Sequence, residues 1–434
     1  MEKQVLIKNI KLLNSACDGW IIGNSVLLEG KRIKEVLPEA ATIDSAHGVE
    51  LVDGQGEYLL PGLIEMHGHF YGRASTAMRS QHLGYCPLYL SSGITTVRTP
   101  GEFEPDITYG YKQSIEHGQT IGPRIITGGW YFDKAPSIVG WFRPVNSIEE
   151  IEACFDERDK VSDQFKVYSS MPKEWVRKVC ELGHAKGKKV YGHLGMCSAR
   201  DAIEVGLDGL EHGYFTVSEF YKEPSPHVES SALEELDMNS DLVKNVQDQI
   251  VTHQIAITPT LLTFMLNGSW FTDWLDHIDA WRYLSPAAKE KQKENRKKWD
   301  EDPKSFDQQE RLIEKQRVYV NALYKRGAKI FCGTDPSYPM MIPGQALVLE
   351  AANLVDCGMS NAAVLRALTI AAATELGIAD VTGSISAGKE ADLLLVNTDP
   401  LQDIHNLDQI SLVWKAGHMH KPDALRELAV ESLR

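Results

Sequence analysis

The sequence lacks the features of disulfide-stabilised and membrane-spanning proteins. Its seven cysteines are scattered along 434 residues and include no Cys-x-x-Cys pair, which argues against a disulfide framework and favours reduced thiols. It has no run of the ~18 consecutive apolar residues that a membrane-spanning helix requires. The first residues, MEKQVLIKNIKLL, are interrupted by Lys and Asn too often to form the apolar part of a signal peptide. We therefore predict a cytoplasmic protein that does not enter a membrane.

Positive charge is also in short supply. Lysine and arginine total 45 against 60 aspartate and glutamate residues, so the formal net charge is −15 at pH 7. An acidic chain without a basic stripe is repelled by nucleic-acid phosphates and by anionic lipid. We therefore expect no nucleic-acid partner and no membrane partner.

The chain contains two kinds of structural pattern. Residues 4–54 and the segment from about 383 onwards show short strand-like runs separated by Gly and Asn turns. Between them, eight candidate strands alternate with helical patterns. This alternation predicts an α/β fold with a (β/α)8 TIM-type barrel. We predict a barrel over residues 61–378 and a small composite β-sandwich built from both termini, residues 1–60 and 379–434.

One segment, residues 262–325, does not follow the alternation. It is long, mostly helical in pattern, and contains Trp270, Trp274, Trp281 and Trp299. We predict a helical insert that covers the active site as a lid. The alternative is that its aromatic residues pack against the barrel wall.

Two histidines, His67 and His69, follow an apolar run in PGLIEMHGHFYG. Alternate residues of a strand point to the same face, and the carboxyl ends of barrel strands form the active face. Both imidazoles can therefore bind one zinc-type ion. Considered alone, the pair is explained as well by a polar loop.

Further candidate ligands lie in other predicted strands or at their ends. His193 lies in YGHLG, His212 in LEHG and Asp335 in GTDP, while Lys166 lies inside the apolar strand QFKVYSS. An unpaired ammonium group is costly to bury, so Lys166 requires a partner. Each residue alone has a structural explanation, such as a hydrogen-bonded core histidine or an aspartate that starts a turn. The histidines and Asp335 recur at the ends of the first, fifth, sixth and eighth predicted strands, and this recurrence predicts a metal site.

This ordered series of motifs resembles the amidohydrolase superfamily of metal-dependent hydrolases. The resemblance covers nearly the whole chain, from DGQGEYLLPGLIEMHGHF through GITTVRTPG, GPRIITGG, FKVYSS, AKGKKVYGHL, GLDGLEHG and CGTDPSYPMMIPG to GSISAGKEADLLLVNTDPL. The chain is most similar to the branch that contains imidazolonepropionase-like enzymes and Xaa-Pro dipeptidases. The resemblance is also compatible with a homo-oligomer.

The resemblance implies a role for each candidate residue. His67 and His69 would bind a first metal ion together with Asp335, and His193 and His212 would bind a second. Both ions would be divalent, with Zn²⁺ expected.

Two residues would have additional roles under the same resemblance. Lys166 matches the family's lysine that reacts with CO₂ to give a carbamate bridging the two metals, which would also explain a buried lysine. Asp335 would serve as general base towards a metal-bound water. This agrees with the ordinary chemistry of a divalent metal, which lowers the pKa of bound water and polarises a carbonyl.

The chain departs from its relatives where substrate would be recognised. It has Thr99 where many relatives carry an acid, and its loops GGWYFDKAPSIVGWF and PSYPMMIPG differ from theirs. Peptidase specificity is therefore not implied. Four aromatic residues after the third and fourth predicted strands are candidates for an apolar substrate pocket, with ordinary packing as the alternative: Trp130, Tyr131, Trp141 and Tyr168.

The predicted function is hydrolysis of an amide, peptide or cyclic amide C–N bond in a small-molecule substrate by a metal-activated water. Alternatives are an esterase, lactonase or phosphotriesterase on the same metals, and a mononuclear enzyme in which Lys166 is not carboxylated. A non-catalytic scaffold of the same fold is disfavoured because every ligand position is filled. A deaminase is disfavoured because no acid lies one helical turn after His193.

Overall fold

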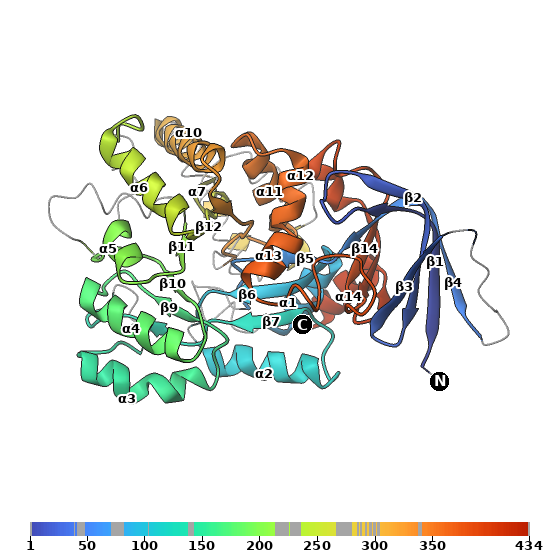
Figure 1. The fold of residues 1–434 in the computed structure, drawn as a ribbon, viewed down its shortest axis with the longest axis horizontal. Helices are drawn as coiled ribbons and strands as arrows, with labels where there is room; N and C mark the ends of the chain where they lie inside the picture. Colours follow the sequence, from blue (N-terminus) through green and yellow to red (C-terminus); the bar gives the residue numbers. More distant parts are fainter. Residues whose placement is uncertain are drawn as a thin grey trace.

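The computed structural model shows a strand-and-helix barrel with a separate β-sheet beside it (Figure 1). The structure describes residues 2–432 except for the following positions: 39, 41–47, 71–81, 103, 138–142, 213–224, 226–235, 266–279, 284–285, 287–288, 291–292, 295–296, 298–300, 302–303 and 337–340.

The barrel is built from short strands that pair in parallel. They are β5 (Leu63–Glu65), β6 (Ile94–Thr99), β7 (Arg124–Thr127), β8 (Tyr131–Phe132), β9 (Phe165–Val167), β10 (Val190–Gly192), β11 (Gly209–Glu211), β12 (Ala256–Thr258) and β13 (Lys329–Ile330). The third position is shared, because β7 pairs with β6 and β8 pairs with β9. The strand is interrupted between β7 and β8 at Gly129, whose φ of +58° favours glycine. The barrel closes where the Met66 amide donates to the Cys332 carbonyl at 3.0 Å. The predicted barrel and its eight strand positions are confirmed.

Strand alternation sorts the barrel side chains into two sets. In β9, Phe165 and Val167 belong to the main apolar core, which the barrel shares with the surrounding helices, and Lys166 between them is also buried. Because successive side chains of a strand point to opposite faces, Lys166 lies inside the barrel. The barrel therefore encloses the Lys166 amine, and only 1% of this side chain is exposed.

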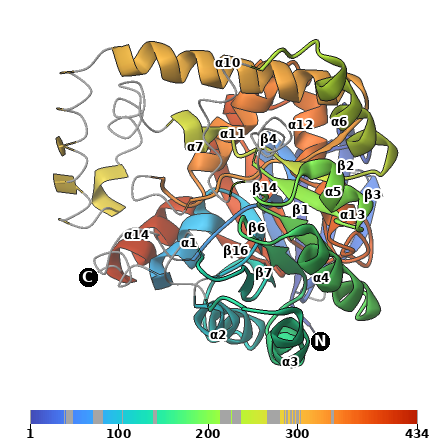
Figure 2. The same cartoon turned by 90° about the vertical axis from the view of Figure 1, so that its left-hand side faces the viewer.

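The helices follow the strands around the barrel, as Figure 2 shows for α10, α11 and α12. Serine side chains cap several of them: Ser147, for example, accepts from the Glu150 amide at 3.2 Å and starts α3. The helices are α1 (His82–Ser91), α2 (Pro105–Glu116), α3 (Ile148–Asp159), α4 (Lys173–Ala185), α5 (Ala199–Glu204), α6 (Asp241–Thr252), α7 (Leu262–Met265), η5 (Ala280–Tyr283), α10 (Lys304–Lys325), α11 (Ala346–Asp356), α12 (Asn361–Ala367) and α13 (Ile370–Glu375).

Within the predicted lid segment, α10 packs against α6, α7 and α11 on the outside of the barrel. Trp281 is half-buried against the main core, as the packing alternative expects. Trp270, Trp274 and Trp299 lie outside the described residues. The lid itself stays a prediction.

Both ends of the chain contribute to one seven-stranded sheet, at the right of Figure 1. Its strands, in spatial order, are β16 (His418–His420), β15 (Ile410–Lys415), β14 (Leu393–Val396), β4 (Glu50–Pro61), β1 (Gln4–Leu13), β2 (Trp20–Glu29) and β3 (Arg32–Pro38). They enclose a core of their own that includes Ile7, Leu59 and Trp414. The composite terminal domain is therefore confirmed. The expectation of β structure to the C-terminus was wrong, because Pro422–Ser432 form helix α14, which packs on α1 of the barrel.

An ion-pair cluster joins the terminal sheet to the barrel. Asp392 is fully buried and accepts from Lys415 Nζ at 2.9 Å, while Arg124 of β7 lies 3.3 Å from the same carboxylate and also pairs with Glu390. Burial alone would raise the pKa of Asp392, but Lys415 and Arg124 outweigh it and hold the pKa below its usual value. Asp392 is therefore ionised at neutral pH and balances two cations.

We expect Asp392→Asn to lower the free energy of unfolding by about 3 kcal/mol at pH 7, because it leaves buried cations without their anion. The stabilisation is present above the unfolded-state pKa of about 4 and is lost as the pH falls through the lower folded-state value. The variant should therefore lose part of the wild-type sensitivity to acid. Urea unfolding at several pH values measures this. Asp423→Asn is the control that should change little, because the Asp423 side chain is 93% exposed and pairs with Arg426, outside the cluster.

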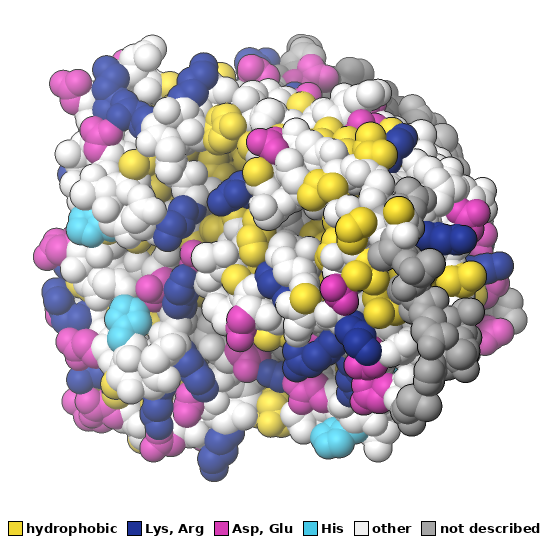
Figure 3. Space-filling model, turned by 45° about the vertical axis from the view of Figure 1, so that its right-hand side comes forward, with side chains coloured by type: hydrophobic (Ala, Val, Ile, Leu, Met, Phe, Trp, Pro, Cys, Tyr) yellow, Lys and Arg dark blue, Asp and Glu magenta, His cyan; other side chains and the backbone are white. Residues whose placement is uncertain are grey.

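The charge of the surface and the composition of the helices bear on whether the protein could bind nucleic acid or span a membrane. On the face shown in Figure 3, lysine and arginine side chains are interspersed with aspartate and glutamate, so this face carries no continuous basic surface. Among the described residues, no helix combines the length and the apolar character needed to span a membrane. All seven cysteines are free.

Candidate metal centre

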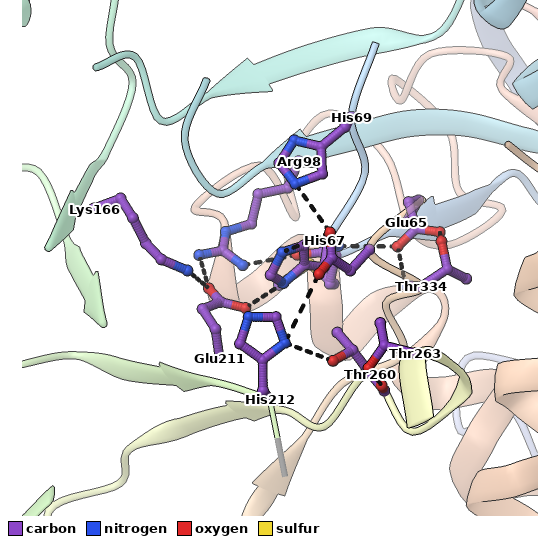
Figure 4. A network of polar contacts seen from close by, with 12 residues as sticks. Glu65, His67, His69, Arg98, Lys166, Glu211, His212, Thr260, Thr263 and Thr334 are labelled. Atoms are coloured by element: carbon purple, nitrogen blue, oxygen red, sulfur yellow. Dashed lines mark hydrogen bonds and ion pairs between the residues drawn. The ribbon is translucent and has the colours of Figure 1, made fainter. Parts of the chain in front are cut away.

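The predicted ligands meet at the carboxyl ends of the barrel strands. His67 and His69 follow β5, Lys166 lies within β9, His193 follows β10 and His212 follows β11. Asp335 follows β13, and its amide donates to the His67 carbonyl at 2.8 Å. Figure 4 shows several of these side chains converging from separate strands.

Three of the residues form a compact donor cluster. The donor atoms of His67, His69 and Asp335 all lie within 4.8 Å of one another, and the three side chains are buried. Asp335 Oδ1 lies 3.2 Å from His69 Nε2 and 3.8 Å from His67 Nε2. Ligands at 2.0–2.2 Å from one tetrahedral ion are about 3.4 Å apart. Imidazole nitrogen and carboxylate oxygen are also the donor types that zinc accepts, so this set fits a divalent ion.

The two remaining histidines continue the cluster. His212 Nδ1 lies 2.7 Å from Thr260 Oγ1 and 4.0 Å from Asp335 Oδ2. The His193 ring lies 4.5 Å from the His212 ring, which in turn lies 5.0 Å from the His67 ring. The structure thus brings all four histidines and Asp335 together.

The backbone is strained at this site. His212, Thr260 and Asp335 have φ of 73°, 48° and 52°, a region that residues with a side chain adopt at a cost. The surrounding hydrogen bonds hold these conformations. Strained residues commonly cluster at functional sites, which agrees with a functional role for the loops that follow β11, β12 and β13.

Burial and mutual charge shift the ionisation of these groups. Burial lowers the pKa of His67, against the opposing pull of Glu211 and Asp335. Burial also acts to lower the pKa of His69, but the carboxylates of Asp335 and Glu102 outweigh it and raise this pKa to about 9. Burial acts to raise the pKa of Asp335, and the imidazoles hold it well below its usual value. The carboxylate is therefore ionised across the physiological range.

Lys166 lies inside the barrel beside this cluster. Its side chain is 1% exposed, and Nζ lies 4.0 Å from Glu211 Oε1. Burial lowers the pKa of Lys166 to about 8, so its neutral amine is more accessible near physiological pH than that of an exposed lysine. A neutral amine is the form that can react with CO₂.

Several polar residues at the site were not among the predicted functional residues. Arg98 and Glu211 carry a signal in the sequence, because each is a charged residue within or at the end of a predicted barrel strand. Glu65 is similar: it accepts from the amides of His67 and Thr334, both at 2.9 Å, and ties the ends of β5 and β13 together. Glu102, buried with its Oε2 3.9 Å from His69 Nδ1, lies in a loop and gives no such signal.

The structure describes three of the four aromatic residues that are predicted to contact substrate. Tyr168 is half-buried, with its ring 4.4 Å from that of His193. Tyr131 is 6% exposed and packs edge-on against Tyr168 at 5.3 Å. Trp130 is half-buried, with the Arg143 guanidinium 6.0 Å from its ring. Trp141 lies outside the described residues.

The chain is similar to known proteins in sequence and in structure. The model of the amidohydrolase family matches residues 58–419. The crystal structure of a Xaa-Pro dipeptidase with bound methionine has a TM-score of 0.74 and 20% identity, over 96% of this chain and 100% of that one. A putative prolidase from Bifidobacterium longum has a TM-score of 0.72 and 22% identity, over 99% of each chain. A dihydroorotase from Pediococcus pentosaceus is 27% identical over 121 residues, and the match spans only 27% of either protein.

Proposed function

The chain belongs to the amidohydrolase family of hydrolytic enzymes, and we propose that it is a metal-dependent hydrolase that cleaves an amide, peptide or cyclic amide C–N bond in a small substrate. The observation that carries the proposal is the buried cluster of His67, His69 and Asp335. Three protein ligands leave a coordination position of the metal open for water or substrate. Such a site at the carboxyl ends of barrel strands suits catalysis better than a structural site with four protein ligands.

In the proposed enzyme, His67, His69 and Asp335 would hold one Zn²⁺ ion, and His193 and His212 would hold a second. When bound, the metal pair supplies an activated water at neutral pH and polarises the scissile carbonyl. The imidazoles bind through neutral nitrogen, and burial favours that form in His67 and His212 by lowering the pKa of each. Metal ions would displace the proton from His69.

Lys166 is proposed to be carboxylated. Its neutral amine would attack CO₂, forming a nitrogen–carbon bond and releasing one proton, and the resulting carbamate anion would bridge the two cations. The enclosed position of Lys166 supports this, because a buried side chain there must be neutral or paired. The 4.0 Å separation from Glu211 is too long for a hydrogen bond.

Asp335 is proposed as the general base. It accepts the proton of the attacking water and delivers it to the leaving nitrogen as the C–N bond breaks. Asp335 is in the ionised form, which is the form that can accept a proton. The aromatic residues Tyr168, Tyr131, Trp130 and Trp141 are proposed to contact the apolar part of the substrate.

Other activities on the same centre remain alternatives to the proposal. They are ester, lactone or phosphotriester hydrolysis, and amide hydrolysis by a mononuclear enzyme without the carbamate. A non-catalytic scaffold is disfavoured, because the ligand positions are filled and their side chains converge.

The proposal is tested by an activity screen of Zn²⁺-loaded protein. The panel contains dipeptides, N-acyl amino acids, cyclic amides, lactones and phosphotriesters. We expect turnover of at least one C–N substrate, loss of that turnover after dialysis against a chelator, and recovery on adding Zn²⁺. Turnover confined to lactones or phosphotriesters would show that the enzyme does not cleave C–N bonds. A protein that binds no metal and turns over no substrate of the panel would favour the non-catalytic scaffold.

A further inference from the structure

A buried carboxylate inside the barrel contacts the first histidine of the pair directly. Glu211 Oε2 lies 2.8 Å from His67 Nδ1, and both side chains are enclosed, with 0% and 3% exposure. The other ring nitrogen, Nε2, faces Asp335. His67 is therefore held between a carboxylate on its Nδ1 side and the proposed metal position on its Nε2 side.

Glu211 is itself fixed by Arg98. The Arg98 Nη2 donates to Glu211 Oε1 at 2.6 Å, so each carboxylate oxygen has a different partner. Arg98 is fully buried and bonds in addition to Gln164 Oε1 at 2.9 Å and to the Met66 carbonyl at 2.7 Å. Its guanidinium lies 3.8 Å from the Tyr191 ring centroid. Figure 4 shows Arg98, Lys166 and His67 meeting at Glu211.

This geometry determines which tautomer His67 adopts. An ionised carboxylate can only accept hydrogen bonds, so the proton of a neutral imidazole must lie on Nδ1, and the Nε2 lone pair is free for a metal. The fully buried Arg98 guanidinium donates to the other oxygen of the same carboxylate at 2.6 Å. A carboxylate held against a cation in this way accepts a hydrogen bond from the imidazole.

We infer that Glu211, held in place by Arg98, is a positioning residue that orients His67 towards the first metal ion and strengthens metal binding. The inference rests on the metal centre of the proposed function. An ion pair that served only the stability of the barrel would need Arg98 and Glu211 alone. The direct bond from the second oxygen to His67 is the feature that assigns the pair a role at the metal.

The test is the affinity of metal-free protein for Zn²⁺, measured by competition with a chromophoric chelator. Glu211→Gln keeps the size of the side chain, but its amide nitrogen must face either Arg98 or the His67 Nδ1–H, so a donor meets a donor at one of the two contacts. We expect the dissociation constant of the tighter site to rise about 10- to 100-fold, as is usual when a partner of a metal-bound histidine is lost. The visible spectrum of the Co²⁺-substituted protein should change as well.

Glu350→Gln is the matched control. Glu350 is also a fully buried carboxylate, but it accepts from the Leu261 and Leu262 amides and contacts none of the proposed ligands. This variant should bind Zn²⁺ with wild-type affinity. Equal losses in Glu211→Gln and Glu350→Gln would point to general loosening of the barrel and would overturn the inference.

The outcomes separate this inference from the proposed function. A wild-type protein that binds no metal contradicts the proposed function itself. A wild-type protein that binds Zn²⁺, with a Glu211→Gln variant that binds it equally well, overturns only the positioning role. If Glu211→Gln does not fold, Arg98→Lys serves instead, because it keeps the charge but removes the second contact that orients Glu211. It should weaken Zn²⁺ binding to a smaller degree, and unchanged binding would overturn the inference.

Discussion

Replacing Asp335 by asparagine is expected to lower kcat/KM by about 10³-fold or more, since the change removes both a general base and an anionic ligand. Asparagine occupies nearly the same volume, so packing should be kept. The Oδ1 atom would still lie near His69, but it could no longer accept a proton. The measurement is steady-state kinetics on the best substrate from the screen, together with metal content per chain.

Asp208→Asn is the control for this prediction. Asp208 lies just before β11, at the opposite end of the strand from His212, and bonds to His184 and to the Val190 amide. Its replacement should leave kcat/KM within a few-fold of wild type. If Asp335→Asn retained most of the wild-type rate with full metal content, Asp335 would not be the base.

The second large effect is expected for Lys166→Ala. Loss of the bridging carbamate removes an anion from between two cations, so we expect the variant to hold fewer than two tightly bound metals and to lose about 10²-fold or more in kcat/KM. Mass spectrometry of the native wild-type protein should show one added CO₂, and the variant should show none. Retention of two tightly held metals and full activity would contradict the bridging role.

Lys189→Ala provides the comparison. Lys189 directly precedes β10 and pairs with Glu375. Its loss should leave metal content and turnover unchanged.

The carbamate can also be tested in the wild-type protein alone. Carbamate formation consumes CO₂, so uptake of the second metal should depend on CO₂. Metal-free protein kept in CO₂-depleted buffer should take up its second Zn²⁺ only after bicarbonate is added.

The barrel could be predicted because its strands are short apolar runs separated by helical patterns with serine caps and glycine turns. Two details of the fold could not. The third strand is split at Gly129 because its halves pair with different neighbours, and pairing partners are not visible in one sequence. Helix α14 follows a strand-rich segment, and its packing on α1 is a tertiary contact.

Site residues could be predicted where a charged side chain occurs within a strand that is otherwise apolar. Lys166 was identified because an ammonium group within an apolar strand needs a partner. The same reasoning applies to Arg98 and Glu211, which are charged residues of the barrel strands β6 and β11 and form a buried ion pair beside His67. Glu102 and Thr260 could not be found this way, because polar residues are ordinary in loops and only the folded chain brings them to His69 and His212.

The converging histidines, Lys166 and Asp335 are proposed to hold catalytic metal. The most direct test is the metal content of the wild-type protein. The protein is first reconstituted with Zn²⁺ and bicarbonate, and loosely bound ions are then removed. We predict two Zn²⁺ ions per chain, with hydrolytic activity that rises in step with occupancy. A protein that retains no metal, or whose activity is the same with and without it, would contradict the account.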